Sequence, residues 1–177
     1  MNGVVLVTGV MAAGKSTVAQ ALAEQLPRAA HVRGDVFRRM IVSGRTEYGP
    51  GADGEAEDQL LLRYRLSATT ADAYARAGFT AVVQDVVLGA HLTAYVELVR
   101  TRPLYVVVLA PRAETVAARE ADRAKTGYDG AAWTVPALDE VLRASTPRIG
   151  LWLDTSELTV AETVEKILAG RERARVA

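Results

Sequence analysis

Short apolar runs alternate along this chain with longer stretches in which apolar residues recur every three or four positions. The apolar runs are rich in β-branched residues and predict strands at residues 4–7, 30–32, 80–84, 104–109 and 149–153. The stretches between them predict helices at residues 17–26, 36–42, 55–77, 92–100, 113–121, 137–144 and 160–169. The charged end of the chain, residues 171–177, is expected to fray.

Strands that alternate with helices pair in parallel, joined by right-handed crossovers. The runs 4–7 and 104–109 are apolar on both sides, which suits a sheet covered by helices on both faces. The pattern therefore predicts an α/β fold, with one domain spanning residues 1–177. In such a sheet ligands bind beyond the carboxyl ends of the strands, so functional residues are expected directly after each strand.

Composition narrows the class of protein. Half of the residues are hydrophobic, which is enough for a core, and the 21 basic and 21 acidic residues cancel, which argues against a nucleic-acid surface. The absence of cysteine excludes a disulfide framework, a thiol nucleophile and a zinc–thiolate site. No apolar run approaches the roughly 18 residues of a membrane span, and the first run lacks the basic start of a signal peptide. A cytoplasmic protein is the resulting expectation.

A glycine-rich stretch directly follows the first predicted strand. It has the spacing G-x-x-x-x-G-K-[ST] and lies between a strand and a helix, which is the context of a phosphate-binding loop. Its glycines allow the backbone to curl, so that the N–H groups at the helix start point at phosphate oxygens. The residues expected to bind the nucleotide are Gly9, Ala12, Ala13, Gly14, Lys15, Ser16 and Thr17.

Two side chains of this loop carry the chemistry that a nucleoside triphosphate requires. Lys15 brings a positive charge to the β and γ phosphates, and the Ser16 hydroxyl is a ligand for Mg²⁺. ATP and Mg²⁺ are therefore the expected cofactors.

Two aspartates follow the second and third predicted strands. Asp35 is either the general base that accepts the proton of an acceptor hydroxyl or the N-cap of the helix at 36–42. Asp85 either holds Mg²⁺, directly or through water, or positions the acceptor; the alternative is a solvated strand end or a cap of the next helix. The two could exchange roles, and the sequence leaves open which one is the base.

Arginines cluster beyond the fourth predicted strand. Arg119 and Arg123 share one helix face and lead into a polar segment, which favours a lid at about residues 119–135. Such a lid closes over ATP, excludes water and brings an arginine to the transferring phosphoryl group. The alternative is an ordinary charged helix face. Thr155, after the fifth strand, either contacts the adenine or belongs only to a turn.

The segment of about residues 36–78 is the expected acceptor-binding region. It includes a loop at 43–54 with four glycines and one proline. The candidates for acceptor contacts are Asp35, Phe37, Arg38, Arg39, Tyr48, Tyr64 and Asp85. The two histidines, His31 and His91, are assigned to structural positions, and the two tryptophans, Trp133 and Trp152, to packing.

These pieces together resemble the chloramphenicol phosphotransferase-like proteins, which are small-molecule kinases of the P-loop superfamily. The matching pieces occur in the same order over nearly the whole chain: residues 9–17, 34–35, 83–89, 119–123 and 153–155. The resemblance implies a three-layer sandwich whose five-stranded parallel sheet has the phosphate-loop strand in the middle. It also implies ATP- and Mg²⁺-dependent phosphorylation of a hydroxyl on a small molecule, with Asp35 as the base and Arg119 and Arg123 as lid arginines.

One departure from that family stands at the end of the third strand. The family carries two adjacent acidic residues there, whereas this chain has Gln84 before Asp85. A neutral amide cannot replace a carboxylate in metal or base chemistry. The region 43–66 matches only loosely, so chloramphenicol itself is not implied, and the expected acceptor is an antibiotic or another hydroxylated natural product.

Three other functions remain open at this level. One is a metabolic kinase of the shikimate or gluconate type, and another is a nucleotide-dependent switch or ATP-hydrolysing module without a small acceptor. A nucleic-acid 5′-kinase is disfavoured by the neutral charge. The sequence names neither the acceptor nor its reacting hydroxyl, and it leaves open whether the protein forms a homo-oligomer.

Overall fold

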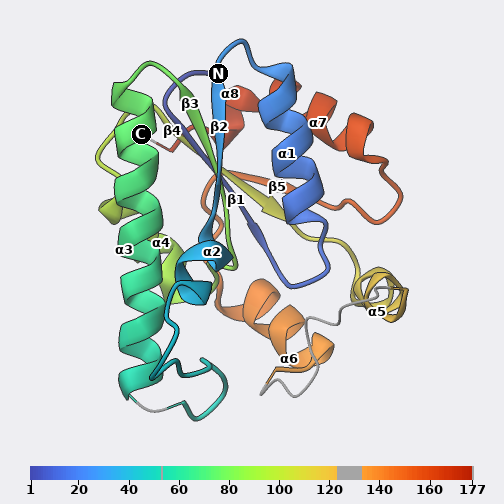
Figure 1. The fold of residues 1–177 in the computed structure, drawn as a ribbon. Coiled ribbons are helices and arrows are strands. Elements are labelled where there is room, and N and C mark those ends of the chain that lie inside the picture. The colour runs from blue at the N-terminus through green and yellow to red at the C-terminus, as the bar shows by residue number, and fades with distance from the viewer. Residues whose placement is uncertain (53, 123–132, 177) are drawn as a thin grey trace.

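Five parallel strands form the centre of the molecule, as a computed structural model that describes residues 1–52, 54–122 and 133–176 shows (Figure 1). The strands are β1 (Val4–Gly9), β2 (Ala29–Arg33), β3 (Thr80–Gln84), β4 (Leu104–Leu109) and β5 (Leu151–Leu153). Their order is β2-β3-β1-β4-β5, and every pair is parallel. The predicted fold class is confirmed, with the phosphate-loop strand in the middle of the sheet.

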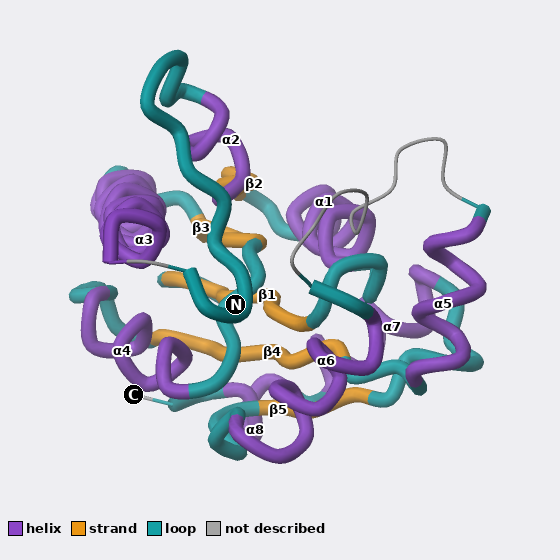
Figure 2. The backbone as a smooth tube through the Cα atoms, turned by 90° about the horizontal axis from the view of Figure 1, so that it is seen from below, coloured by secondary structure: helices purple, strands orange, loops and turns teal. Residues whose placement is uncertain are grey.

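Helices cover both faces of this sheet. They are α1 (Lys15–Gln25), α2 (Gly34–Arg39), α3 (Gly54–Arg76), α4 (Ala90–Leu98), α5 (Ala113–Ala121), α6 (Val135–Glu140), a π-helical turn (Val141–Ser145), α7 (Val160–Ala169) and α8 (Arg171–Ala174). Figure 2 shows α3 and α4 on one face and α1 and α7 on the other. Every residue of β1, β3 and β4 is buried, as a sheet covered on both faces requires.

The fifth strand is shorter than the predicted 149–153. Gly150 has φ 74°, and a Cβ there would lie 2.3 Å from the Val106 carbonyl oxygen. This left-handed residue bends the chain against β4, so regular pairing begins only at Leu151.

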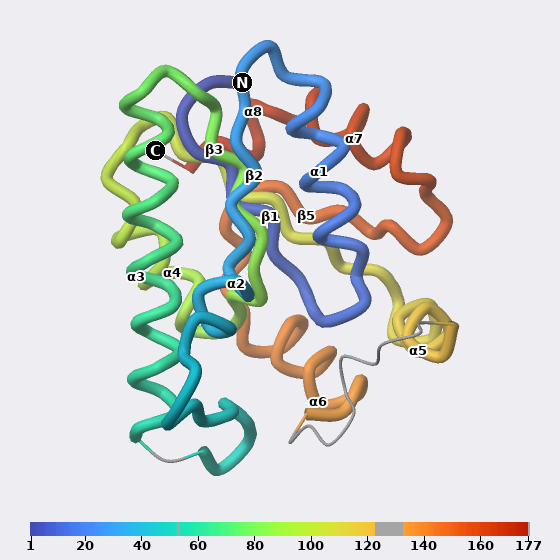
Figure 3. The backbone as a smooth tube through the Cα atoms, in the orientation of Figure 1, coloured from blue at the N-terminus to red at the C-terminus, as the bar shows by residue number. Residues whose placement is uncertain are grey.

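The expectation that residues 171–177 fray is wrong for the part that the structure describes. After α8, the Val176 N–H donates to the Leu104 carbonyl at 3.0 Å, and Arg175 forms an antiparallel bridge with Tyr105 (Figure 3). Since β5 pairs only with Val107–Leu109, the start of β4 has an open edge on that side, and the C-terminal segment fills it.

No helix in the described ranges combines the length and the apolar character that crossing a membrane requires.

Candidate active site

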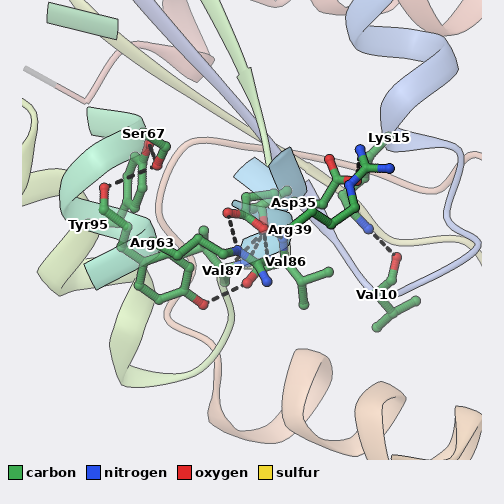
Figure 4. Close-up of polar contacts among 12 residues, drawn as sticks. Val10, Lys15, Asp35, Arg39, Arg63, Ser67, Val86, Val87 and Tyr95 are labelled. Atoms are coloured by element: carbon green, nitrogen blue, oxygen red, sulfur yellow. Dashed lines mark hydrogen bonds and ion pairs between the residues drawn. The ribbon is translucent and has the colours of Figure 1, made fainter. Parts of the chain in front are cut away.

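The phosphate loop joins the middle strand to α1. Gly9 has φ 146° and Gly14 has φ 90°, and a Cβ on Gly9 would lie 2.4 Å from the Leu109 carbonyl oxygen. Gly14 is the N-cap of α1 and has no side chain with which to cap it. No side chain of the N-cap residue therefore satisfies the N–H groups of the first turn, and the positive end of the helix dipole lies at this loop. The Lys15 ammonium donates to the Val10 carbonyl within the loop at 2.7 Å (Figure 4).

A cavity of about 790 Å³ opens beside this loop. Its wall includes most of the predicted site residues, which come from separate parts of the chain: Ala12, Gly14, Lys15, Ser16, Thr17, Asp35, Arg38, Asp85 and Arg119. Gly9 and Ala13 support the loop from behind, since Ala13 is buried and Gly9 contacts β4. The sheet topology thus brings the nucleotide candidates and the acceptor candidates to one space.

Asp35 projects from the first turn of α2. That helix begins at Gly34 with Arg33 as its N-cap, so the interpretation of Asp35 as the cap of a helix at 36–42 is wrong. The Asp35 carboxylate instead pairs with Arg39, one turn later, at 2.9 Å, and 47% of its side chain is exposed (Figure 4). An accessible carboxylate therefore lines the same cavity as Lys15.

Asp85, unlike Asp35, is almost fully buried, with 1% of the residue exposed. The Arg63 Nε donates to Asp85 Oδ2 at 2.8 Å, and the Arg63 Nη2 donates to Oδ1. The Val86 N–H also donates to Oδ1, at 2.7 Å. Both carboxylate oxygens are therefore engaged by protein donors, and the predicted metal-binding role of Asp85 stays a prediction.

Sequence reasoning missed Arg63. It lies on α3, and burial lowers the pKa of its guanidinium. One signal was available from its position. Arg63 precedes the buried Ser67 by one helical turn, and residues four apart share a helix face. A charged residue on a buried helix face requires a partner, and the topology supplies Asp85.

Aromatic rings line the far side of the cavity. Tyr48 and Tyr64 each make an edge contact with His91, with ring centroids 6.0 and 5.7 Å apart. The Trp133 indole N–H donates to the Tyr48 carbonyl at 3.2 Å. His91 and Trp133 were assigned to structure and packing, yet both line the cavity. Phe37, a predicted acceptor contact, is partly buried against the hydrophobic core instead.

The predicted lid region is described only in part. Arg119 lines the cavity, and its Nη2 donates to the Thr155 carbonyl at 2.8 Å. This contact joins two predicted nucleotide-site residues, although the Thr155 side chain is only 3% exposed and is not part of the cavity wall. Arg123 and the rest of residues 123–132 lie outside the described residues.

The charges on the acceptor side of the cavity are paired. Arg38 contacts Glu47, and Arg63 is bound to Asp85, so neither arginine brings an uncompensated positive charge. Among the described residues, no cluster of three or more histidine and acidic side chains could hold a metal ion. An octahedral Mg²⁺ usually binds through few protein ligands together with phosphate oxygens, and the exposed Ser16 hydroxyl fits that mode.

The chain shares its fold with solved structures that include kinases. An unliganded sugar kinase from Janibacter sp. HTCC2649 is 20% identical with a TM-score of 0.72, and 98% of this chain and 96% of that one are covered. A gluconokinase from Sinorhizobium meliloti 1021 is 21% identical with a TM-score of 0.67, covering 97% and 92%. The tunicamycin resistance protein of Deinococcus radiodurans is 15% identical with a TM-score of 0.68, covering 100% and 99%. At these identities the likeness establishes the fold.

Sequence comparison identifies the family. No curated protein matches this chain in sequence. The family model described as an AAA domain matches residues 4–148, a range that runs from β1 past the π-helical turn and contains the whole cavity wall. The chain therefore belongs to the AAA domain family.

Proposed function

We propose that this protein is an ATP-dependent O-phosphotransferase that moves the γ-phosphate of ATP to a hydroxyl of a small molecule. The observation that carries the proposal is that Lys15 of the phosphate loop and the accessible carboxylate of Asp35 line one cavity. A phosphoryl donor site beside a candidate base is the arrangement that an alcohol kinase needs.

The described residues fit ATP and Mg²⁺. The first-turn N–H groups of α1 and the Lys15 ammonium suit the phosphates, and Ser16 would hold the metal ion. Bound Mg²⁺ neutralises charge on the phosphate oxygens.

In the proposed reaction, Asp35 accepts the proton of the acceptor hydroxyl. The hydroxyl oxygen forms a bond to the γ-phosphorus as the bond from that phosphorus to the β-γ bridging oxygen breaks, and ADP leaves. Lys15 and Arg119 stabilise the charge that develops on the phosphoryl oxygens. Arg123 is proposed as a second arginine that stabilises this charge. Residues 119–135 are proposed as a lid, and residues of about 36–78 as the acceptor-binding region of the single kinase domain.

An antibiotic or a related natural product is the acceptor class that we propose, in line with the resemblance to chloramphenicol phosphotransferase-like proteins. The aromatic wall of Tyr48, Tyr64, His91 and Trp133 supports an acceptor with an apolar part. The fold shared with a tunicamycin resistance protein motivates testing antibiotics first.

A metabolic kinase of the gluconate type is the second candidate, and the shared fold of a gluconokinase motivates it. The paired charges of Arg38 and Arg63 weigh against it, because a carboxylate substrate is best held by an uncompensated cation. A nucleotide-dependent switch remains the alternative in which ATP is hydrolysed without a small acceptor.

The first experiment measures ADP formation with ATP, Mg²⁺ and one of five acceptors: chloramphenicol, tunicamycin, glucose, gluconate or shikimate. Calorimetry of ATP with and without Mg²⁺ measures binding separately. Magnesium-dependent ATP binding together with acceptor-dependent ADP formation supports a kinase. ATP hydrolysis that ignores every acceptor favours the switch, and a lack of ATP binding contradicts both.

The second experiment replaces the proposed base. Asp35→Asn keeps the side-chain shape but cannot accept the proton, so turnover should fall by about 10²–10⁴-fold while calorimetric ATP affinity stays nearly unchanged. Asp58→Asn is the matched control, because Asp58 is exposed on α3 and is not part of the cavity wall. Normal turnover by Asp35→Asn would show that Asp35 is not the base.

A further inference from the structure

Gln84 occupies the end of β3 between the two halves of the proposed site. In the sheet it lies beside Val7 of β1 and Arg33 of β2. Two residues beyond Val7 the phosphate loop begins at Gly9, and two residues beyond Arg33 comes Asp35. Gln84 also lines the cavity that these segments share. An acceptor that reaches from Asp35 to the phosphate loop therefore passes this side chain.

The Gln84 side chain lacks a hydrogen-bond partner within the described part of the chain. Its residue is 6% exposed, and its Oε1 is buried without a donor. A buried amide oxygen without a partner costs free energy that a folded protein normally avoids. A methionine or leucine of similar volume would avoid that cost. Because Gln84 lines the cavity, a turn of its carboxamide would bring this oxygen to a donor bound there.

A second glutamine in the same cavity provides the contrast. The Gln59 Nε2 donates to the Gly44 carbonyl at 2.7 Å, and its Oε1 accepts from the Thr46 N–H at 3.0 Å. Gln59 thus ties the 43–54 loop to α3. Gln84 makes no comparable contact with a described residue.

The surroundings of Gln84 determine which chemical group would suit it. The charge of Asp85, the next residue, is neutralised by Arg63. A carboxamide is itself neutral and has both a donor and an acceptor end. An uncharged hydroxyl or amide can satisfy such a group without the burial of a new charge.

We propose that Gln84 is a specificity-determining residue whose carboxamide hydrogen-bonds an uncharged hydroxyl or amide group of the acceptor. The proposal rests on the proposed kinase function and deepens it. It assigns a role to the position at which this chain departs from the acidic pair of the family that it resembles. The acceptor presents a neutral polar group to Gln84, rather than a carboxylate or an ammonium group.

The first test measures thermal unfolding of the ligand-free full-length protein. Gln84→Met removes an unpaired polar group and should raise Tm by about 2–4 °C. Gln59→Met removes the hydrogen bonds to Gly44 and Thr46, among others, and should lower Tm by a similar amount. If Gln84→Met lowers Tm as Gln59→Met does, Gln84 is a structural residue and the proposal is overturned.

The second test uses turnover. With the compound of the five-member panel that the unmodified protein phosphorylates best, Gln84→Met should raise the acceptor KM by about ten-fold or more and leave the KM for ATP unchanged. An unchanged acceptor KM, or a change in the KM for ATP or in Mg²⁺ dependence instead, overturns the assignment of Gln84 to the acceptor. The kinase function stands in either case.

The panel also tests the chemical class of the acceptor. Chloramphenicol, tunicamycin and glucose are uncharged at neutral pH, whereas gluconate and shikimate carry a carboxylate. Phosphorylation confined to the two carboxylates overturns the proposal and leaves the protein a kinase. Magnesium-dependent ATP binding without phosphorylation of any panel compound overturns the proposed function, and with it the acceptor role of Gln84.

Discussion

At the scale of single residues, the site depends on how closely the backbone of Gly34 approaches Asp85. A Cβ on Gly34 would lie 1.9 Å from Asp85 Oδ2, and the Asp85 carboxylate cannot retreat because Arg63 and the Val86 N–H hold both oxygens. A side chain at residue 34 would therefore displace either α2 or the ion pair. Asp35, the adjacent residue, would move with it.

We predict that Gly34→Ala lowers both Tm and turnover. A steric overlap of this kind lowers the free energy of unfolding by about 1–3 kcal/mol, which corresponds to a Tm lower by about 2–10 °C. Thermal unfolding and the ADP assay measure the two effects. Gly54→Ala is the matched control, because a Cβ on Gly54, the first residue of α3, meets no atom within 4 Å. Equal stability of the two variants would contradict the prediction.

At the scale of elements, the buried ion pair joins α3 to the end of β3. The Arg63 and Asp85 side chains are 14% and 2% exposed, so solvent screens them little. Removing one partner leaves the other buried and uncompensated, whereas removing both leaves an apolar contact.

We predict that Arg63→Met destabilises the protein by about 3–5 kcal/mol, and that adding Asp85→Leu restores much of this loss. Urea unfolding of the two variants gives the free energies. Arg38→Met is the control, since the Arg38–Glu47 pair is more exposed, at 35% and 67%, and should cost less than about 1 kcal/mol. A double variant that is less stable than Arg63→Met would show that the pair contributes net stability.

At the scale of the whole molecule, two tyrosine hydroxyls lie inside the fold between α3, α4 and the segment after β3. The Tyr64 hydroxyl donates to the Val86 carbonyl at 2.7 Å. The Tyr95 hydroxyl lies 2.9 Å from Ser67 Oγ (Figure 4). Burial raises the pKa of both tyrosines well above the ordinary value. The folded protein therefore keeps them neutral where an unfolded chain would ionise them.

This shift predicts a loss of stability at alkaline pH. Because the pKa in the folded state is raised, the full stability is present below the unfolded pKa of roughly 10 and is lost as the pH rises above it. Each tyrosine contributes a fall of up to about 1.4 kcal/mol per pH unit. Tyr64→Phe should make the fall of Tm above pH 10 less steep, whereas Tyr74→Phe, at an exposed position, should not. Identical slopes in all three proteins would contradict the burial argument.

Most of the fold follows from local pattern. The strands at 80–84 and 104–109 and the helices at 113–121 and 160–169 match their predicted bounds, because each is an uninterrupted run with clear end signals. The last of these begins at a capping box, in which Thr159 and Glu162 satisfy each other's backbone groups. The predicted boundary of an element is wrong where contact with a distant segment sets it. Gly150, which lies against Val106, is the example.

The sequence by itself determined the α/β architecture and the phosphate loop, since both depend on residues close together in the chain. Only the tertiary structure decided that Arg63 holds Asp85, that Tyr48, His91 and Trp133 form one wall, and that the C-terminal segment pairs with β4. These contacts join residues more than 20 positions apart. Periodicity and spacing report the local chain conformation, whereas the partner of a buried charge depends on which elements the packed sheet brings together.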